Sequence, residues 1–471
     1  MPMKKRIGAA FAVTALLLGL TACATEGGGS TPASSQTTSP DSQTSSGGTQ
    51  ESYINTLPRN RGPAGEVGEL PPMTLTENDV LTIKDGVFML EGKPFAEISF
   101  NKFGLFTQLI DPLLKGDPST YETMLKKQDQ ALAELHEMGF RSIRVFMSPW
   151  APSDTKNAWY NVQGILFKAM DDVVGMCEKY DIKIVWCLGL TSFVEKWMVT
   201  GGWELGEYQM RELIADENSI ARQEMYKYLD GIIQRYRNSK AVLTWELANE
   251  ISLDADIMPD TKTYEDQRMP TLKDVATFYD QVAQRIHQND PLRLVNSGGS
   301  SMRESQWNQY VNNSWQKDTE EEQYKALEFL YKDSACDIID IHWYANNKLG
   351  NTVLDNETGQ EMILNLGHYK RFADAIGKPL MVGEVGVCPI VDEEGYFDNY
   401  DDVETARPFF KRQLDEIVDN GIPLSYWWTY SSDRPQDEGV GGFSLKKGSD
   451  DELLEMIIEA NQRLKAKYGA A

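Results

Sequence analysis

Short apolar runs recur along the second part of the chain, and polar segments separate them. Runs of this length, without a polar residue at every second place, are typical of strands that are buried on both faces. They predict eight strands, which lie at Phe95–Phe100, Ser142–Phe146, Ile182–Leu188, Val242–Leu247, Leu292–Asn296, Ile338–Ile341, Leu380–Gly383 and Leu424–Trp428.

Amphipathic patterns of helical period fill the intervals between these runs. Apolar residues recur in them every three or four positions, which predicts helices with one buried face. The clearest lie at Tyr121–Met138, Phe167–Lys179, Ile220–Arg237, Leu272–His287, Met362–Ala375 and Ala406–Asn420. Gly139 and Gly421 follow two of them, where a glycine commonly ends a helix.

Strands that alternate with helices predict a parallel sheet with helical crossovers. The number eight favours closure into a (β/α)8 TIM barrel over an open doubly wound sheet, and no glycine-rich turn follows the first run. Extra length after three strands predicts extended βα loops on the face where barrel active sites lie, at Thr191–Asn218, Ile251–Pro270 and Ser297–Lys325. Ahead of the barrel, Asp85-Gly86 predicts the tight turn of a hairpin.

The N-terminus has the pattern of an export signal. Lys4, Lys5 and Arg6 precede the apolar stretch Ile7–Leu20, which is too short for a membrane span and closes on Leu-Thr-Ala-Cys at Cys23. This ending resembles the lipobox of bacterial lipoproteins, which implies cleavage before Cys23 and attachment of lipid to its sulfur. The alternative is an ordinary secretory signal with an incidental cysteine.

The residues after Cys23 are mostly Ser, Thr, Gly, Gln and Pro, a composition that cannot bury a core and is typical of a flexible tether. We therefore expect a single folded domain behind a tether. The expected division is a signal peptide at 1–22, a tether at 23–52, a connector at 53–80 and the (β/α)8 domain at 81–471.

Composition narrows the range of partners. The net charge of −25 argues against nucleic acid or an anionic membrane surface as the main partner. This charge fits an extracytoplasmic protein with a neutral substrate, and a composition of 41% hydrophobic and 25% charged residues does not call for a polytopic membrane protein. We expect a monomer that touches the membrane only through its N-terminal lipid.

The four further cysteines leave two possibilities open. Export permits disulfides among them, but buried free thiols fit the sequence equally well. No CxxC spacing is present, so zinc-ribbon spacing is absent. The four are Cys177, Cys187, Cys336 and Cys388.

Two glutamates stand at the ends of apolar runs, and they are the candidate catalytic residues. Glu250 ends AVLTWELANE, and Glu384 lies in KPLMVGEVGV. Ionisable groups at strand ends of a parallel barrel indicate a site, and two carboxylates are the equipment for hydrolysing a glycosidic bond. Glu246 lies inside its strand, so we expect it to be a structural carboxylate.

Other polar and aromatic residues end the neighbouring strands and should meet the two glutamates at one rim. Each also has a structural alternative: the arginine could be on the surface, the histidine could belong to the core, and one of the two tryptophans should be packing. These residues are Arg144, Asn249, His342, Tyr344, Trp427 and Trp428.

With these residues in place, the chain resembles the clan of retaining β-glycosidases on the (β/α)8 barrel, most closely family 5 of the glycoside hydrolases. The motifs are TWELANE on strand four, HWY on strand six and VGEVG on strand seven, and the resemblance covers roughly Leu81–Tyr468. The WELANE wording is similar to the endo-β-1,4-mannanase branch. The resemblance implies one catalytic domain that hydrolyses β-linked polysaccharide or oligosaccharide, foremost β-1,4-mannan, without a cofactor or metal.

The resemblance also implies roles for single residues. Glu250 would be the acid/base and Glu384 the nucleophile, which Arg144 would keep ionised. The substrate-binding roles are Asn249 on the sugar 2-hydroxyl, Arg144 and Tyr344 as hydrogen-bond donors to the nucleophile, His342 lining the catalytic subsite and Trp428 stacking beneath the sugar.

Two departures from the family pattern bear on the substrate. Ile251 follows the Asn-Glu pair where the family usually has proline, and the third strand reads VWCLGLT without the family's histidine. The alternatives are a cellulase-type β-1,4-glucanase of the same family, a non-catalytic carbohydrate-binding lipoprotein, and a two-lobed solute-binding protein.

Overall fold

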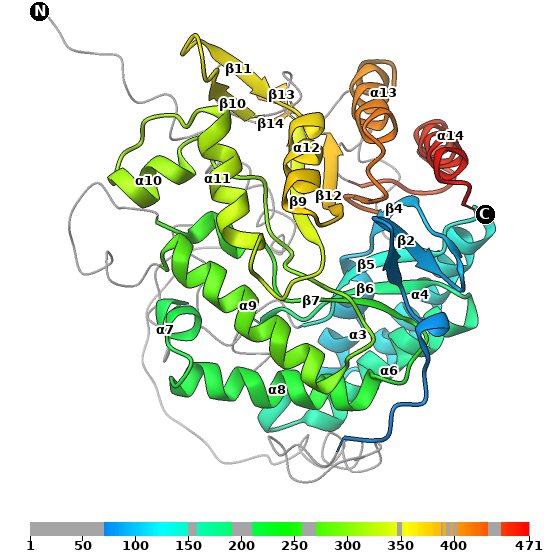
Figure 1. Ribbon diagram of the computed structural model, residues 1–471. Coiled ribbons are helices and arrows are strands. Elements are labelled where there is room, and N and C mark those ends of the chain that lie inside the picture. The colour runs from blue at the N-terminus through cyan, green and yellow to red at the C-terminus, as the bar shows by residue number, and fades with distance from the viewer. Residues whose placement is uncertain are drawn as a thin grey trace, which may run out of the picture.

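A parallel sheet of eight strands forms the centre of the molecule (Figure 1). The computed structural model describes residues 70–148, 158–190, 210–256, 270–345, 351–387, 390–391, 397–398, 403–431 and 444–470. The strands, in sheet order, are β8 (Val295–Asn296), β7 (Val242–Glu246), β6 (Lys183–Cys187), β5 (Ser142–Phe146), β4 (Glu97–Asn101), β15 (Leu424–Trp427), β12 (Leu380–Val387) and β9 (Ile339–Ala345). A parallel bridge from Asn296 to Ile338 joins the two ends of this order, so the predicted (β/α)8 TIM barrel is confirmed.

Helices surround the strands, and their apolar faces cover the outside of the barrel (Figure 1). α9 shows why they form where they do: Thr271 and Asp274 make a capping box, and Val275, Phe278 and Val282 follow on one buried face. The helices are α3 (Gly104–Leu114), α4 (Pro118–Glu137), α6 (Gln163–Lys179), α7 (Met210–Ala215), α8 (Ile220–Tyr236), α9 (Leu272–Asn289), α10 (Gln306–Asn312), α11 (Glu320–Tyr331), α12 (Leu366–Ile376), α13 (Val403–Asp419) and α14 (Asp451–Tyr468).

Two sequence predictions about these segments were wrong in part. The helix expected at Met362–Ala375 starts later, because Asn365 caps it with a capping box and Met362 belongs to the hairpin β10 (Asn351–Leu354) and β11 (Glu361–Leu364). The loop expected at Ser297–Lys325 contains α10 and the first turns of α11, which Thr319 and Glu322 cap. For α11 and α12 a side-chain cap, rather than the apolar period, decides where the helix begins.

A small antiparallel sheet closes the N-terminal end of the barrel. It consists of β1 (Thr82–Lys84), β2 (Val87–Leu90) and β3 (Lys93–Pro94), and the predicted turn at Asp85-Gly86 has φ of 52° and 77°. Its apolar side chains form one buried cluster with the first residues of the barrel strands. The members include Leu81, Phe88, Leu90 and Phe95 from this segment, and Val185, Leu243, Met381 and Leu424 from the barrel.

Three of the cysteines are free and buried: Cys177, Cys187 and Cys336. Cys388 lies outside the described residues, as do Cys23, the signal peptide and the tether. In the part of the chain that the structure describes, no helix combines the length and the apolar character needed to cross a membrane.

Candidate active site

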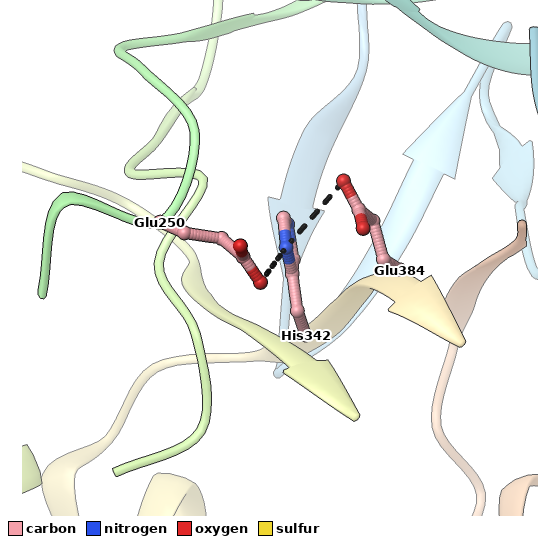
Figure 2. Close-up of side chains that lie close together, drawn as sticks. All are labelled: Glu250, His342 and Glu384. Atoms are coloured by element: carbon pink, nitrogen blue, oxygen red, sulfur yellow. Dashed lines mark hydrogen bonds and ion pairs between the residues drawn. The ribbon is translucent and has the colours of Figure 1, made fainter. Parts of the chain in front are cut away.

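The two candidate glutamates face each other across one histidine at the carboxyl ends of the strands. Glu250 follows β7, Glu384 lies in β12 and His342 in the adjacent β9 (Figure 2). His342 Nδ1 is 3.0 Å from Glu250 Oε1 and 3.5 Å from Glu384 Oε1. One oxygen of each carboxylate and a ring nitrogen of His342 lie within 4.8 Å of one another.

An irregularity in β12 places Glu384 beside His342. The register between β9 and β12 shifts between Val382 and Glu384, so that Glu384 pairs with His342. Gly383 occupies the shift: its N–H donates to Asp340 Oδ1 at 3.0 Å, and its carbonyl accepts from Asn101 Nδ2 at 3.0 Å. A Cβ at Gly383 would lie 2.7 Å from Asp340 Oδ1, so only glycine fits this close approach.

The backbone at Glu250 is left-handed, with φ 56° and ψ 23°. A non-glycine residue adopts this conformation only where the surrounding structure holds it, and such positions cluster at functional sites. Here the Glu250 N–H donates to Gly298 O at 2.7 Å. Gly298 also has a positive φ of +66°, and a Cβ there would lie 1.8 Å from Ala248 O.

Arg144 connects the two strand ends through all of its donors. Nε and Nη2 bind the carboxylate of Glu246 at 2.8 and 2.7 Å, and Nη1 binds Glu384 Oε1 at 2.7 Å. The remaining donors reach Asn101 Oδ1 and Asn249 Oδ1, both at 2.8 Å. Glu246 is fully buried, so it acts as a barrel carboxylate that orients Arg144.

The second oxygen of Glu384 is held by Tyr344, whose hydroxyl donates to Oε2 at 2.6 Å. Burial, together with the charge of Glu384, raises the pKa of Tyr344 well above its usual range, so the phenol keeps its proton. Burial works against the charge of Arg144, but Glu246 and Glu384 outweigh it and raise the pKa of Arg144. Both oxygens of Glu384 therefore face donors that do not titrate near neutral pH.

His342 is buried, and burial alone would disfavour its charged form. The charge of Glu384 and the hydrogen bond to Glu250 outweigh burial and raise the pKa of His342. The imidazole is thus coupled to both glutamates, which makes it a part of the site and not an isolated core residue.

Trp427 ends β15 and Trp428 follows it, and the two tryptophans differ in burial. Trp427 is fully buried and stacks on Phe410 with ring centroids 4.5 Å apart. Trp428 is half-buried, and its ring lies 5.5 Å from that of Phe103. The Trp428–Thr429 peptide bond is cis.

Three polar residues of the site escaped the sequence reasoning. Asn101 ends β4 and supports both Arg144 and Gly383. Asn296 ends β8 and donates to Glu246 Oε2 at 3.0 Å and to Asp340 Oδ2 at 2.8 Å. Burial, with a further contribution from Glu246, raises the pKa of Asp340 to about 7. The available signal was a polar residue inside an apolar run, which in a buried strand requires a partner.

Glu250, His342 and Glu384 could, by their donor types, also hold a metal ion. The surroundings oppose this reading. The guanidinium of Arg144 and the hydroxyl of Tyr344 already occupy the oxygens of Glu384, and the fixed positive charge of Arg144 would repel a second cation.

The eight-stranded parallel barrel and the two carboxylates at the carboxyl ends of its strands place the protein in the class of TIM-barrel enzymes, whose active sites lie at this rim. The chain belongs to family 5 of the glycoside hydrolases: the family described as cellulase (glycosyl hydrolase family 5) matches residues 97–433.

Curated relatives match shorter segments. The chain is 28% identical over 137 residues to a probable mannan endo-1,4-beta-mannosidase A of Aspergillus niger, covering 26% of this chain and 34% of that protein. It is 25% identical over 195 residues to mannan endo-1,4-beta-mannosidase 1 of Solanum lycopersicum, covering 37% of this chain and 44% of that protein. The chain thus spans less than half the length of either relative.

Solved structures match over most of the chain. A family 5 mannosidase from Rhizomucor miehei superposes with a TM-score of 0.56 at 16% identity, covering 84% of this chain and 99% of that one. The endo-1,4-beta-mannanase from the same organism gives a TM-score of 0.55 at 14% identity, with 82% and 99% covered. At such identities the likeness concerns the fold.

Proposed function

We propose that the protein is a retaining glycosidase in which Glu384 is the nucleophile and Glu250 the acid/base. The observation that carries the proposal is the spacing of the two carboxylates, which have oxygens within 4.8 Å of each other around His342. Retaining enzymes hold these groups about 5–5.5 Å apart, whereas inverting enzymes need about 6.5–9.5 Å to admit a water.

The environments of the two glutamates divide the chemistry between them. Glu384 accepts from Arg144 and Tyr344, and these two donors hold its carboxyl group in a fixed position from which it can attack the anomeric carbon. Glu250 stands at the other side with His342 as its hydrogen-bond partner. It gives a proton to the leaving oxygen in the first step, and in the second step it takes one from the water that attacks the glycosyl-enzyme.

We assign the remaining rim residues to substrate binding. Asn249 is oriented by Arg144, which leaves its amide nitrogen to meet the sugar 2-hydroxyl. Trp428 is half-buried at the end of β15 and offers a ring for stacking on the sugar. His342 and Tyr344 line the same subsite.

The proposed substrate is β-1,4-mannan or its oligosaccharides. The names of the curated relatives and of the structural neighbours support mannan. A cellulase-type β-1,4-glucanase is the second candidate, because the matching family is described as cellulase. No cofactor or metal enters the proposed reaction.

The test is hydrolysis by the purified protein of mannan, glucomannan, cellulose, xylan and aryl β-glycosides, with the first-formed anomer followed by NMR. We expect release from mannan with retained configuration, unchanged by EDTA. An inverted product would exclude the double displacement, activity confined to cellulose would favour the glucanase, and binding without hydrolysis would indicate a carbohydrate-binding protein.

Variants of the two glutamates assign the roles. For Glu250→Ala, activity on an activated aryl glycoside should fall less than on polysaccharide, and azide should partly restore it with a β-glycosyl azide as product. Glu384→Ala should lose activity on both substrates, and any azide product should have the α configuration. The opposite pairing of azide products would mean that the roles are exchanged.

We further propose that the protein is exported and held on the outside of a bacterial membrane through lipid on Cys23. The support is the sequence alone, with a basic start, a short apolar stretch and a cysteine before a polar tether. Cys23→Ala should release the protein from the membrane fraction or block its processing. Unchanged processing and retention in this variant would exclude the proposal.

A further inference from the structure

The side chain of Glu250 leaves the backbone from a turn with few alternatives. η3 (Ile251–Asp254) begins directly after Glu250, which has φ 56°. The Leu253 N–H donates to Glu250 O at 2.9 Å, while the Glu250 N–H is bound to Gly298 O. The direction in which the Glu250 carboxyl points therefore depends on how this turn is held.

One arginine from the next βα loop holds the end of the turn. Nη1 of Arg303 donates to Leu253 O, and Nη2 donates to Ala255 O. Nε and Nη2 also donate to Oε1 of Gln309, on α10, at 3.1 and 2.6 Å. Because the guanidinium is a rigid planar fork, this single group fixes the position of the turn relative to α10.

The use that Arg303 makes of its charge is informative. Among the described residues, its hydrogen bonds go to two main-chain carbonyls and one side-chain amide oxygen, and none goes to a carboxylate. Charge-assisted hydrogen bonds are roughly twice as strong as neutral ones. Here these charge-assisted hydrogen bonds hold the conformation of the segment that follows Glu250.

We propose that Arg303 is the positioning residue for Glu250, holding η3 so that the Glu250 carboxyl stays beside His342 and opposite Glu384 (Figure 2). The proposal rests on the proposed function, in which Glu250 is the acid/base. Arg303 acts through the turn and takes no direct part in the reaction.

A displaced acid/base has a recognisable kinetic signature. Proton donation matters most when the leaving group is poor, and a misplacement of about 1 Å can cost about a hundredfold in rate. We expect Arg303→Met to lower kcat/KM, which reports the first step, roughly ten- to hundredfold on mannan but less than about threefold on a dinitrophenyl β-glycoside. On the dinitrophenyl glycoside kcat and KM should fall together, because Glu250 is also the base of the second step and the glycosyl-enzyme then accumulates. Arg303→Lys should recover only part of the loss. Its ammonium keeps the charge but cannot hold both carbonyls in one plane.

Arg293 provides the control at the N-terminal end of β7, the strand whose C-terminal end leads into Glu250 and η3. Arg293 is fully buried and also binds main-chain carbonyls, with Nε donating to Val242 O at 3.0 Å and Nη1 to Arg237 O; unlike Arg303, it also pairs with Asp290 at 2.7 Å. Val242 begins β7 and Arg237 ends α8 just before it, whereas η3 lies beyond the C-terminal end of β7. Arg293→Met should lower the melting temperature and leave the ratio of the two kcat/KM values at that of the wild type.

The outcomes separate the inference from the function on which it rests. A wild-type protein without activity on any substrate would overturn the proposed function. An active wild type together with an Arg303→Met variant that loses both activities in equal proportion would overturn the positioning role. If Arg303→Met does not fold, Gln309→Met removes only the group that orients Arg303. The same change in the ratio of the kcat/KM values would support the role, and an unchanged ratio would exclude it.

Discussion

Arg144 is the residue on which the geometry of the site depends most. Its five donors connect Glu246, Glu384, Asn101 and Asn249, which come from β7, β12, β4 and the segment after β7. A lysine has one compact ammonium group and could not meet these partners in their present positions. The carboxylate of Glu384 on β12 is thereby held by a side chain of β5, on another part of the barrel wall.

Tyr344→Phe removes the other hydrogen bond to Glu384 without changing the shape of the side chain. A hydrogen bond to a charged group contributes about 1.5–3 kcal/mol, so kcat/KM should fall roughly ten- to hundredfold. The melting temperature should change little. Tyr468→Phe, which removes a hydrogen bond to Gly421 O far from the site, is the control, and wild-type kinetics in Tyr344→Phe would contradict the assigned role.

Asp254 should make stability depend on pH. Asp254 is buried, and burial raises its pKa from 3.8 to about 7. The charge of Arg303 works against this increase, and the charge of Glu250 adds to it. A raised pKa means that the folded state resists ionisation of this group, which lowers the free energy of unfolding once the group is ionised in the unfolded state. This loss of stability is absent below about pH 4, grows as pH rises and is complete above about pH 7. A shift of this size corresponds to something on the order of 4 kcal/mol.

Asp254→Asn removes this penalty, so the variant should gain stability relative to wild type as pH rises from 4 to 8. Urea unfolding at several pH values measures the difference. The exposed Asp374→Asn serves as the control. A constant difference between Asp254→Asn and wild type across this range would show that Asp254 is not held in its neutral form.

At the scale of elements, the turn after β7 packs closely against the loop after β8. This contact requires the glycine at Gly298 in that loop. Gly298→Ala would place a Cβ 1.8 Å from Ala248 O, so the backbone that accepts from Glu250 must move. We expect a loss of several kcal/mol in stability together with most of the activity.

The matched control is Gly359→Ala, between β10 and β11. Gly359 has nearly the same φ, +65° against +66°, but no atom lies within 4 Å of the added Cβ. Only the cost of the left-handed conformation, about 1–2 kcal/mol, should be lost there, with activity unchanged. Equal effects at the two glycines, measured by denaturant unfolding and kcat, would argue against a steric cause.

The sequence predicts the strands well, because a buried parallel strand must be an apolar run, and it brings Glu250 and Glu384 to one rim. Two strand ends are predicted too early: β9 continues to Ala345 instead of Ile341, and β12 continues to Val387 instead of Gly383, so that Glu384 lies inside its strand. The sequence could not show that Asn101, Asn296 and Asp340 form a hydrogen-bonded network, since their partners lie on other strands. Helix starts such as Leu366 depended on a capping box with His368, which the apolar period does not reveal.

At the scale of the whole molecule, the two ends of the barrel have different tasks. The carboxylates stand at the C-terminal end, and the small sheet β1–β3 packs its apolar side chains into the N-terminal end. Stability and activity should therefore respond to separate sets of substitutions.

Phe88→Ala tests this separation. Phe88 is fully buried in the cluster that closes the N-terminal end, and truncating a buried phenylalanine costs about 3–5 kcal/mol. We expect a lower melting temperature with unchanged kcat below the transition. A large kcat effect of Phe88→Ala would mean that the two ends are coupled.

Deleting residues 1–52 should change neither the melting temperature nor kcat, because a Ser- and Gly-rich tether buries no core.

The way in which the chain enters the barrel has a consequence for its orientation. Residues ahead of β1 run along the N-terminal end, where Thr74 N–H donates to Asn238 Oδ1 and Asp79 pairs with Lys240 at 2.6 Å. An attachment through Cys23, as proposed above, would therefore join the folded domain at its closed end, opposite the rim that carries the carboxylates. A substrate chain that approaches this rim would then not meet the point at which the domain is attached.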